Sequence, residues 1–174
     1  KYVVIQELLQ DPYTIDSRKI NLRMYVLVVC HKRNTDIYVY NDGFMYYTKE
    51  PFVAGSLEFG PNVTTGYIER SVYDKNPLTH SDFKKYLDKK DRLLSPPEEI
   101  IKNTGLPLSK VVFGRINNIL SKVFMSGISR ICSDYKLKSY ITFQMFGVDI
   151  AINDNLWPSV MEINKGPDMS AKDE

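Results

Sequence analysis

The stretch PSVMEINKGP, residues 158–167, places an acid and an amide two positions apart inside an apolar strand pattern. Successive side chains of a strand point to opposite faces, so Glu162 and Asn164 share one face, while Met161 and Ile163 share the other. Carboxylate and carboxamide oxygens are the ligands that a hard divalent cation such as Mg²⁺ prefers. The pattern therefore raises the question of which group lies opposite Glu162.

An acidic residue in the preceding strand pattern, Asp149 of ITFQMFGVDIAI, is the candidate partner of Glu162. If the two face each other in an antiparallel hairpin, the loop centre falls inside the polar segment NDNLWP. The same register pairs Gly147 with Asn164 and Ala151 with Val160, and turns to the other face Val148, Ile150, Ile152, Met161 and Ile163. Like charges opposite each other destabilise a sheet, so this pair needs compensation. Two interpretations stay open: a divalent metal held by Asp149, Glu162 and Asn164, or an acidic edge that is solvated or paired with lysines.

A second polar row comes from the strand pattern KINLRMYVLVV, nearer the N-terminus. By alternation, Lys19, Asn21 and Arg23 lie on one face of that strand and apolar residues on the other. A lysine can meet a phosphate as a point charge, and an arginine can hold a carboxylate through two parallel hydrogen bonds. The alternative is a basic strand face turned to solvent.

Strand and helix periodicities divide the chain into four parts that must position these two rows. Residues 1–52 carry strand patterns, beginning with YVVIQ, and predict antiparallel strands. Residues 53–78 are punctuated by Gly and Pro and predict a loop. Residues 79–138 have helical periodicity, including one long amphipathic helix, and residues 139–167 predict a closing β-hairpin. The order of sheet, helices and sheet predicts an α+β fold in a single domain.

The composition is that of an ordinary globular chain, since 43% of its 174 residues are hydrophobic and 25% are charged. The net charge of +2 is too near zero to indicate a nucleic-acid or membrane partner. No apolar run approaches transmembrane length and no signal-peptide pattern is present, so we expect a cytoplasmic protein. Cys30 and Cys132 are expected to be two separate buried thiols. The lack of an initiator Met and the strand-like first residues suggest a fragment.

Three segments resemble motifs of the tubulin–tyrosine ligase-like family of ATP-grasp ligases, and they occur in that family's order. The segment FQMFGVDIAINDNLWPSVMEINKGP is similar to the family's F-x-x-[FL]-G-x-D motif followed by [LM]-E-[VI]-N-x-x-P. The segments VVIQELLQDPYTIDSRKINLRMYVLV and IYVYNDGFMYYTKEPF resemble the two motifs that precede it. The resemblance implies an ATP-grasp C-terminal subdomain, a mostly antiparallel sheet with helices packed on one side, of which this chain is an incomplete part.

The resemblance also implies ATP and Mg²⁺ as cofactors and assigns roles to individual residues. The positions that match the family's nucleotide contacts are Gln6, Glu7, Leu8, Leu9, Lys19, Asn21, Thr64 and Thr65. The matching metal ligands are Asp149, Glu162 and Asn164. Arg23 and Glu162 match the catalytic positions, with Arg23 placed to hold a carboxylate.

The reaction implied by the resemblance is carboxylate–amine ligation. A carboxylate attacks the γ-phosphorus of ATP, an acyl phosphate forms, and an amine displaces phosphate to leave an amide. The expected partners are ATP, a free amino acid (tyrosine, glutamate or glycine) and a protein acceptor such as the acidic tail of tubulin. These partners agree with a cytoplasmic, cytoskeleton-associated protein that binds neither nucleic acid nor membrane. The basic segment DFKKYLDKKDR either contacts such a tail or forms an ordinary solvated helix.

Two departures from the family pattern leave other readings of the function open. Asn21 replaces an acid, and Tyr46 stands where the family has an arginine, which leaves the donor amino acid undecided. A catalytically inactive, protein-binding descendant is one alternative. An unrelated α+β domain with a coincidental acidic hairpin is another, and it predicts that Asp149 and Glu162 do not face each other. His31 and His80 fall in expected loops and receive no catalytic role.

Overall fold

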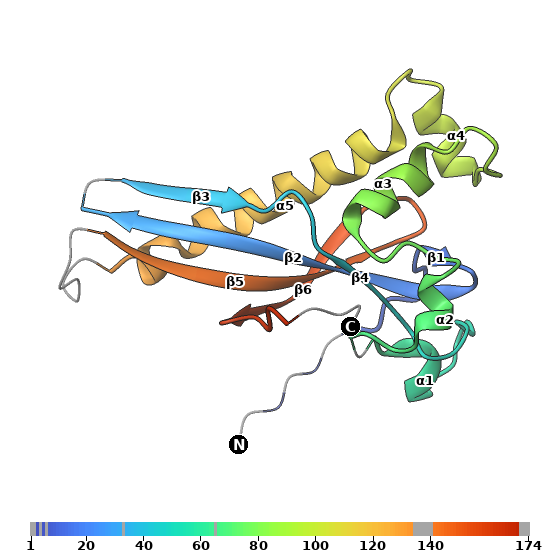
Figure 1. Cartoon of the computed structure of the whole chain (residues 1–174), viewed down its shortest axis with the longest axis horizontal. Helices are drawn as coiled ribbons and strands as arrows, with labels where there is room; N and C mark the ends of the chain where they lie inside the picture. Colours follow the sequence, from blue (N-terminus) through green and yellow to red (C-terminus); the bar gives the residue numbers. More distant parts are fainter. Residues whose placement is uncertain are drawn as a thin grey trace.

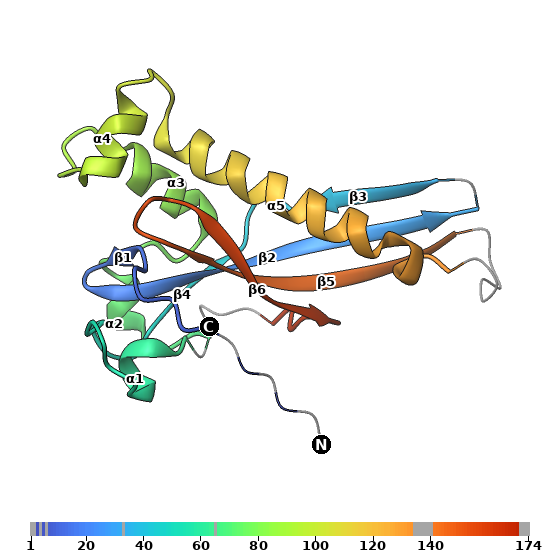
Figure 2. The ribbon, with the colours of Figure 1, turned by 180° about the vertical axis from the view of Figure 1, so that it is seen from behind.

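The computed structural model describes residues 3, 5, 7–32, 34–64, 66–133 and 141–170. Six antiparallel strands form one sheet, and the helices α3, α4 and α5 lie on one side of it (Figures 1 and 2). These helices are α3 (His80–Asp88), α4 (Pro96–Lys102) and α5 (Leu108–Ile131). The predicted α+β class, with helices packed on one side of a mostly antiparallel sheet, is confirmed.

The longest strand, β2 (Arg18–His31), organises the sheet, because four other strands pair with it. They are β1 (Thr14–Ile15), β3 (Thr35–Val39), β4 (Phe44–Tyr47) and β5 (Ile141–Ile152). The last strand, β6 (Pro158–Lys165), pairs with β5 and forms one edge of the sheet. Strands from the two ends of the chain therefore lie side by side, which brings the two polar rows together.

The core lies between the sheet and α5. An apolar stripe of α5 at helical spacing is buried, as its periodicity predicts: Leu108, Val112, Ile116, Leu120 and Phe124. It packs against the alternate side chains of β2 and β5 that point the same way: Ile20, Leu22, Met24, Val26, Val28, Val148, Ile150 and Ile152. Because one face of β2 and β5 packs against α5, the candidate polar side chains of both strands lie on the opposite face.

Residues 53–78, expected to be a loop, contain two single-turn helices, α1 (Phe59–Asn62) and α2 (Arg70–Tyr73). One turn is too short to produce an apolar period, so the sequence carried no signal for them. The strand expected at YVVIQ, residues 2–6, falls largely outside the described residues. Residues 3, 5 and 7–13 form no named strand, and the first named strand begins at Thr14, where pairing with β2 starts.

Two smaller expectations are also corrected. His80 was expected in a loop, but it is the first residue of α3, because Thr79 and Asp82 form a capping box that starts the helix there. Its side chain is fully buried. Cys30 and Cys132 form a disulfide that joins β2 to the residue after α5, so they are not separate thiols. The two cysteines are 102 residues apart in the sequence, and only the packing of α5 on the sheet brings them together. Within the described residues, no helix has the length and apolarity required to cross a membrane.

Candidate functional site

The closing hairpin brings Asp149 and Glu162 opposite each other, in the predicted register. Gly147 also pairs with Asn164 as expected, but the register shifts directly after Asp149. A β-bulge at Met161 shifts the register by one residue, so Ala151 pairs with Ser159 and not with Val160. An unrelated α+β domain with a coincidental acidic hairpin predicted that the two acids do not face each other. The observed pairing excludes that interpretation.

The bulge explains a second correction. Met161 and Ile163 were expected to be buried, yet both are 37% exposed, whereas Val160 packs against the core. Alternation breaks at a bulge, and β6 is an edge strand with little cover. Met161 therefore joins the candidate site and not the core.

A cleft of about 320 Å³ lies on the face of the sheet away from α5. It brings together residues from both ends of the chain that the sequence had singled out: Glu7, Leu8, Leu9, Lys19, Asn21, Thr64, Asp149 and Glu162. Arg23 and Asn164 do not line it, although both lie on strands beside it. Gln6 and Thr65 lie outside the described residues.

Lys19 is only 6% exposed and holds two walls of this cleft together. Its Nζ donates to the carbonyl oxygen of Leu9 at 3.0 Å and to Oδ1 of Asn62 at 2.8 Å, and lies 4.7 Å from the Phe52 ring centroid. Burial lowers the pKa of Lys19. Since both hydrogen-bond acceptors are neutral oxygens, the ammonium charge remains available to an anionic ligand.

Asn62 was missed as a contributor, although it lies two residues before Thr64, a predicted nucleotide contact. It lies at the end of α1, whose helical turn carries it towards β2. Next to it, Thr64 accepts a hydrogen bond at 2.9 Å from the Asn21 amide, and Thr64 also bridges to Thr48. The loop after α1 is thus tied to β2 through Asn21 and to the residue after β4 through Thr48, which could be found only from the tertiary structure.

Arg23 compensates the acidic pair in a way that neither sequence interpretation proposed. Its Nε donates to Oδ1 of Asp149 at 2.7 Å and its Nη2 to Oδ2 at 3.1 Å, and both side chains are 16% exposed. Burial raises the pKa of Asp149, Arg23 offsets part of this, and the charge of Glu162 adds to it. The predicted bidentate grip of Arg23 on a carboxylate is present, but here the carboxylate is that of Asp149.

The oxygen ligands of this region fit a single hard cation. Asp149 and Glu162 are direct neighbours across β5 and β6, and both line the cleft that holds the Lys19 ammonium. Mg²⁺ commonly uses one or two carboxylates and completes its shell with phosphates and water. The described residues contain no cluster of three or more His, Cys, Asp and Glu side chains, so a cation here would depend on its anionic ligand for further oxygens.

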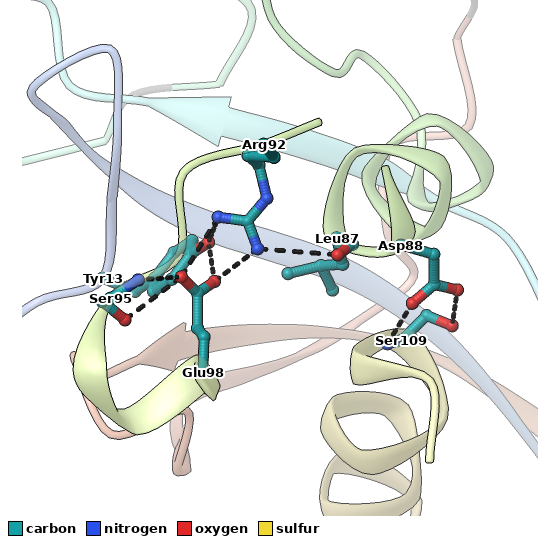
Figure 3. A network of polar contacts seen from close by, with 7 residues as sticks. All are labelled: Tyr13, Leu87, Asp88, Arg92, Ser95, Glu98 and Ser109. Atoms are coloured by element: carbon teal, nitrogen blue, oxygen red, sulfur yellow. Dashed lines mark hydrogen bonds and ion pairs between the residues drawn. The ribbon is translucent and has the colours of Figure 1, made fainter. Parts of the chain in front are cut away.

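The wall formed by residues 7–13 is anchored from behind by a buried ion pair (Figure 3). Tyr13 donates from its hydroxyl to Oε1 of Glu98 at 2.8 Å, and Arg92 donates to the same oxygen at 2.6 Å. Glu98 is 2% exposed, and the Tyr13 amide donates to the carbonyl oxygen of Ile152. The segment is thereby held between the helical layer and β5.

Three basic residues of the segment after Thr79 make contacts within the chain. Lys84 donates to the carbonyl oxygen of Asn41 and lies 4.5 Å from the Phe113 ring centroid, and Lys85 pairs with Asp82. Arg92 belongs to the buried pair with Glu98. These contacts favour the ordinary helix over a surface dedicated to an acidic tail.

A larger cavity of about 830 Å³ lies further along the same face of the sheet. Its walls are mainly aromatic and apolar, and include Tyr25, Tyr38, Tyr40, Phe44, Met145 and Met169. Among the described residues that line it, none is an ionisable acid or base other than tyrosine. The smaller, charged cleft is therefore the candidate functional site.

Comparison with known proteins agrees with the motifs. A family model described as the tubulin-tyrosine ligase family matches residues 1–174. A probable tubulin polyglutamylase of Rattus norvegicus is 27% identical over 98% of this chain and 34% of its own length. A probable beta-tubulin polyglutamylase of Tetrahymena thermophila is 25% identical, over 97% and 15%, and tubulin glycylase 3B of Drosophila melanogaster is 22% identical, over 100% and 22%. The chain therefore spans about a third of the length of the rat protein and less of the other two.

Proposed function

Because this chain belongs to the tubulin-tyrosine ligase family, we propose that it is part of an ATP- and Mg²⁺-dependent ligase that adds an amino acid to a protein tail. The observation that carries the proposal is the cleft in which the buried Lys19 ammonium lies together with the Asp149 and Glu162 carboxylates. Phosphoryl transfer from ATP uses a cationic side chain that contacts the phosphates and carboxylates that hold a metal ion, and this cleft contains both kinds of group.

In this proposal the cleft binds the nucleotide along its length. Glu7, Leu8 and Leu9 receive the adenine, together with Gln6, and Lys19 contacts a phosphate. Asn21, Thr64 and Thr65 complete the nucleotide site. Asp149, Glu162 and Asn164 would hold Mg²⁺, which neutralises charge on the phosphates.

The chemistry then proceeds in two steps. An oxygen of the substrate carboxylate attacks the γ-phosphorus, and the bond to the β-phosphate oxygen breaks to release ADP. The amine nitrogen next attacks the acyl phosphate carbon, and phosphate leaves as the nitrogen loses a proton. Arg23 and Glu162 are the proposed catalytic residues, because both match catalytic positions of the family, and the Arg23 guanidinium already has the geometry that holds a carboxylate through two hydrogen bonds.

The donor and acceptor are proposed from the relatives. Two are named tubulin polyglutamylases and one a tubulin glycylase, so glutamate and glycine are preferred donors, with tyrosine as the third candidate. The acceptor is the tail of tubulin or another acidic tail, which places the protein in the cytoplasm with the cytoskeleton.

The proposal is tested by labelled transfer with the full-length protein. Radioactive glutamate, glycine and tyrosine are each incubated with ATP, Mg²⁺ and tubulin, and incorporation into tubulin is measured. We expect Glu162→Gln to lower incorporation by about a hundredfold, because a charge that stabilises the transition state is lost. Glu99→Gln, at an exposed acid of α4, is the matched control and should leave incorporation unchanged.

The alternative of an inactive, protein-binding descendant gives a different outcome. Asn21 and Tyr46 are the observations that favour it, since both replace charged groups of the family pattern. It predicts no incorporation of any donor, while tubulin is still retained in a pull-down. Equal incorporation by the unaltered protein and Glu162→Gln would refute the role of Glu162 directly.

A further inference from the structure

Gly147 lies in the interior of β5, where a glycine weakens a strand. Its backbone does not require glycine, because the glycines with positive φ are Gly55, Gly66, Gly105 and Gly166. Close approach of other groups is the remaining reason for a glycine in a strand. A Cβ built at Gly147 would lie 2.7 Å from Cβ of Pro167 and 3.0 Å from Nη1 of Arg23.

The Arg23 side chain needs this space in order to reach Asp149. Arg23 lies on β2 and Asp149 directly opposite on β5, with Gly147 two residues before it on the same face. Nε and Nη2 bind the carboxylate, so Nη1 faces Gly147, and Cδ of Arg23 is 3.5 Å from the Cβ position. A two-point contact fixes the plane of the guanidinium, which cannot turn away from Gly147 and keep both bonds.

The other sides of the guanidinium are bounded as well. Cζ of Arg23 lies 5.5 Å from the ring centroid of Tyr46. Beyond β6 the chain turns at Gly166, whose amide donates to the carbonyl oxygen of Met145, and Pro167 then lies against Gly147. Gly147 thus forms the floor of a narrow slot for Arg23.

We propose that Gly147 is a positioning residue: its missing side chain leaves the slot in which Arg23 holds the Asp149 carboxylate. The link from this slot to catalysis rests on the proposed function. The slot itself does not, because it follows from the contacts of Arg23, Asp149 and Pro167 alone.

The test compares Gly147→Ala with Gly114→Ala, a matched control on α5 where an added Cβ meets nothing within 4 Å. Hydrogen exchange of the Arg23 Nε–H is measured by NMR on ¹⁵N-arginine-labelled protein, and the signal is assigned by its loss in Arg23→Ala. We expect exchange to be faster by about tenfold in Gly147→Ala, because the charge-assisted hydrogen bond is broken, and unchanged in Gly114→Ala. Unchanged exchange in Gly147→Ala would overturn the proposal.

A double-mutant cycle distinguishes the effect of the added methyl group on Arg23 from its effect on Pro167. The measured quantity is the affinity for ATP in the presence of Mg²⁺. Gly147→Ala should weaken binding by about tenfold with Arg23 present and by less than about twofold in the Arg23→Ala background. The same loss in both backgrounds would show that Pro167 is the obstacle and refute the role of Gly147. If Gly147→Ala does not fold, the proposal requires that the double variant Gly147→Ala/Arg23→Ala folds as Arg23→Ala does. A double variant that also fails to fold refutes the proposal.

The two proposals fail in different ways. If the Arg23 Nε–H responds as expected and the full-length protein does not bind ATP, the slot stands and the ligase proposal fails. If ATP binds and Gly147→Ala leaves both exchange and affinity unchanged, the ligase proposal stands and the slot fails.

Discussion

His80 illustrates how burial sets the charge of single residues in this fold. It is fully buried at the start of α3, beside Gly43 and with its ring 5.7 Å from that of Phe113. Burial lowers its pKa to about 4, nearby Lys84 lowers it further, and Asp42 acts in the opposite direction. The residue is therefore neutral at physiological pH. It packs between Gly43, which lies just before β4, and Phe113 of α5.

This gives a prediction for the pH dependence of stability. The unfolded chain binds a proton at His80 near pH 6.5, and the folded chain only near pH 4. Stability decreases with falling pH wherever the unfolded state binds more protons than the folded state. The free energy of unfolding should therefore decrease as the pH drops from 6.5 towards 4, by on the order of 3 kcal/mol. Urea unfolding between pH 4 and 7 measures the slope, which His80→Leu should reduce. Identical slopes in the two proteins would contradict the neutral state of His80.

At the scale of elements, the buried pair of Glu98 and Arg92 connects the helices to the wall of the cleft (Figure 3). Burial alone would raise the pKa of Glu98, but hydrogen bonds from Arg92, Ser95 and Tyr13 outweigh it and hold the pKa below its ordinary value. A depressed carboxyl pKa adds stability above the ordinary pKa, and this stability is lost as the pH falls. The pair therefore joins α4 to Tyr13 most firmly near neutral pH.

Removing the charge of Glu98 should separate these elements. Glu98→Gln leaves Arg92 buried without its partner, and we expect it to lower the free energy of unfolding by about 3 kcal/mol or more. Chemical denaturation at pH 7 provides the measurement. Glu99→Gln, one residue further on the same helix and exposed, should change the free energy of unfolding by less than about 0.5 kcal/mol. Equal effects of the two substitutions would show that the pair is unimportant for stability.

For the whole molecule, the disulfide between Cys30 and Cys132 closes the layer of α5 onto the sheet. It spans 102 residues and so restricts most of the unfolded chain between β2 and β5. The cross-link lies at the opposite end of β2 from Lys19 and the cleft. It therefore acts on the stability of the fold and not directly on the candidate site.

Reduction should accordingly destabilise the chain without unfolding it. With dithiothreitol we expect the free energy of unfolding to fall by about 2 to 4 kcal/mol, because the loop constraint on the unfolded state is removed. The double variant Cys30→Ser/Cys132→Ser should match the reduced chain and no longer respond to dithiothreitol. A thiol titration that finds two free cysteines before reduction would contradict the cross-link.

Much of the fold could be predicted because its elements have strong local periods. The apolar stripe of α5 and the facing pair of Asp149 and Glu162 both follow from residue spacing. The bulge at Met161 was not predictable, since an extra residue in one strand changes the register without changing the composition. The one-turn helix α1, which places Asn62 within hydrogen-bonding distance of Lys19, likewise leaves no periodic signal in the sequence.

The sequence by itself determined which face of each strand is polar, because strand alternation is a local property of the backbone. It also carried the family motifs, and with them the candidate residues of both polar rows. Only the tertiary structure decided that these rows share one cleft, that Arg23 neutralises Asp149, and that Gly147 leaves the space for it. Those facts depend on contacts between β2 and β5, more than 100 residues apart in the chain, and no local pattern encodes such a distance.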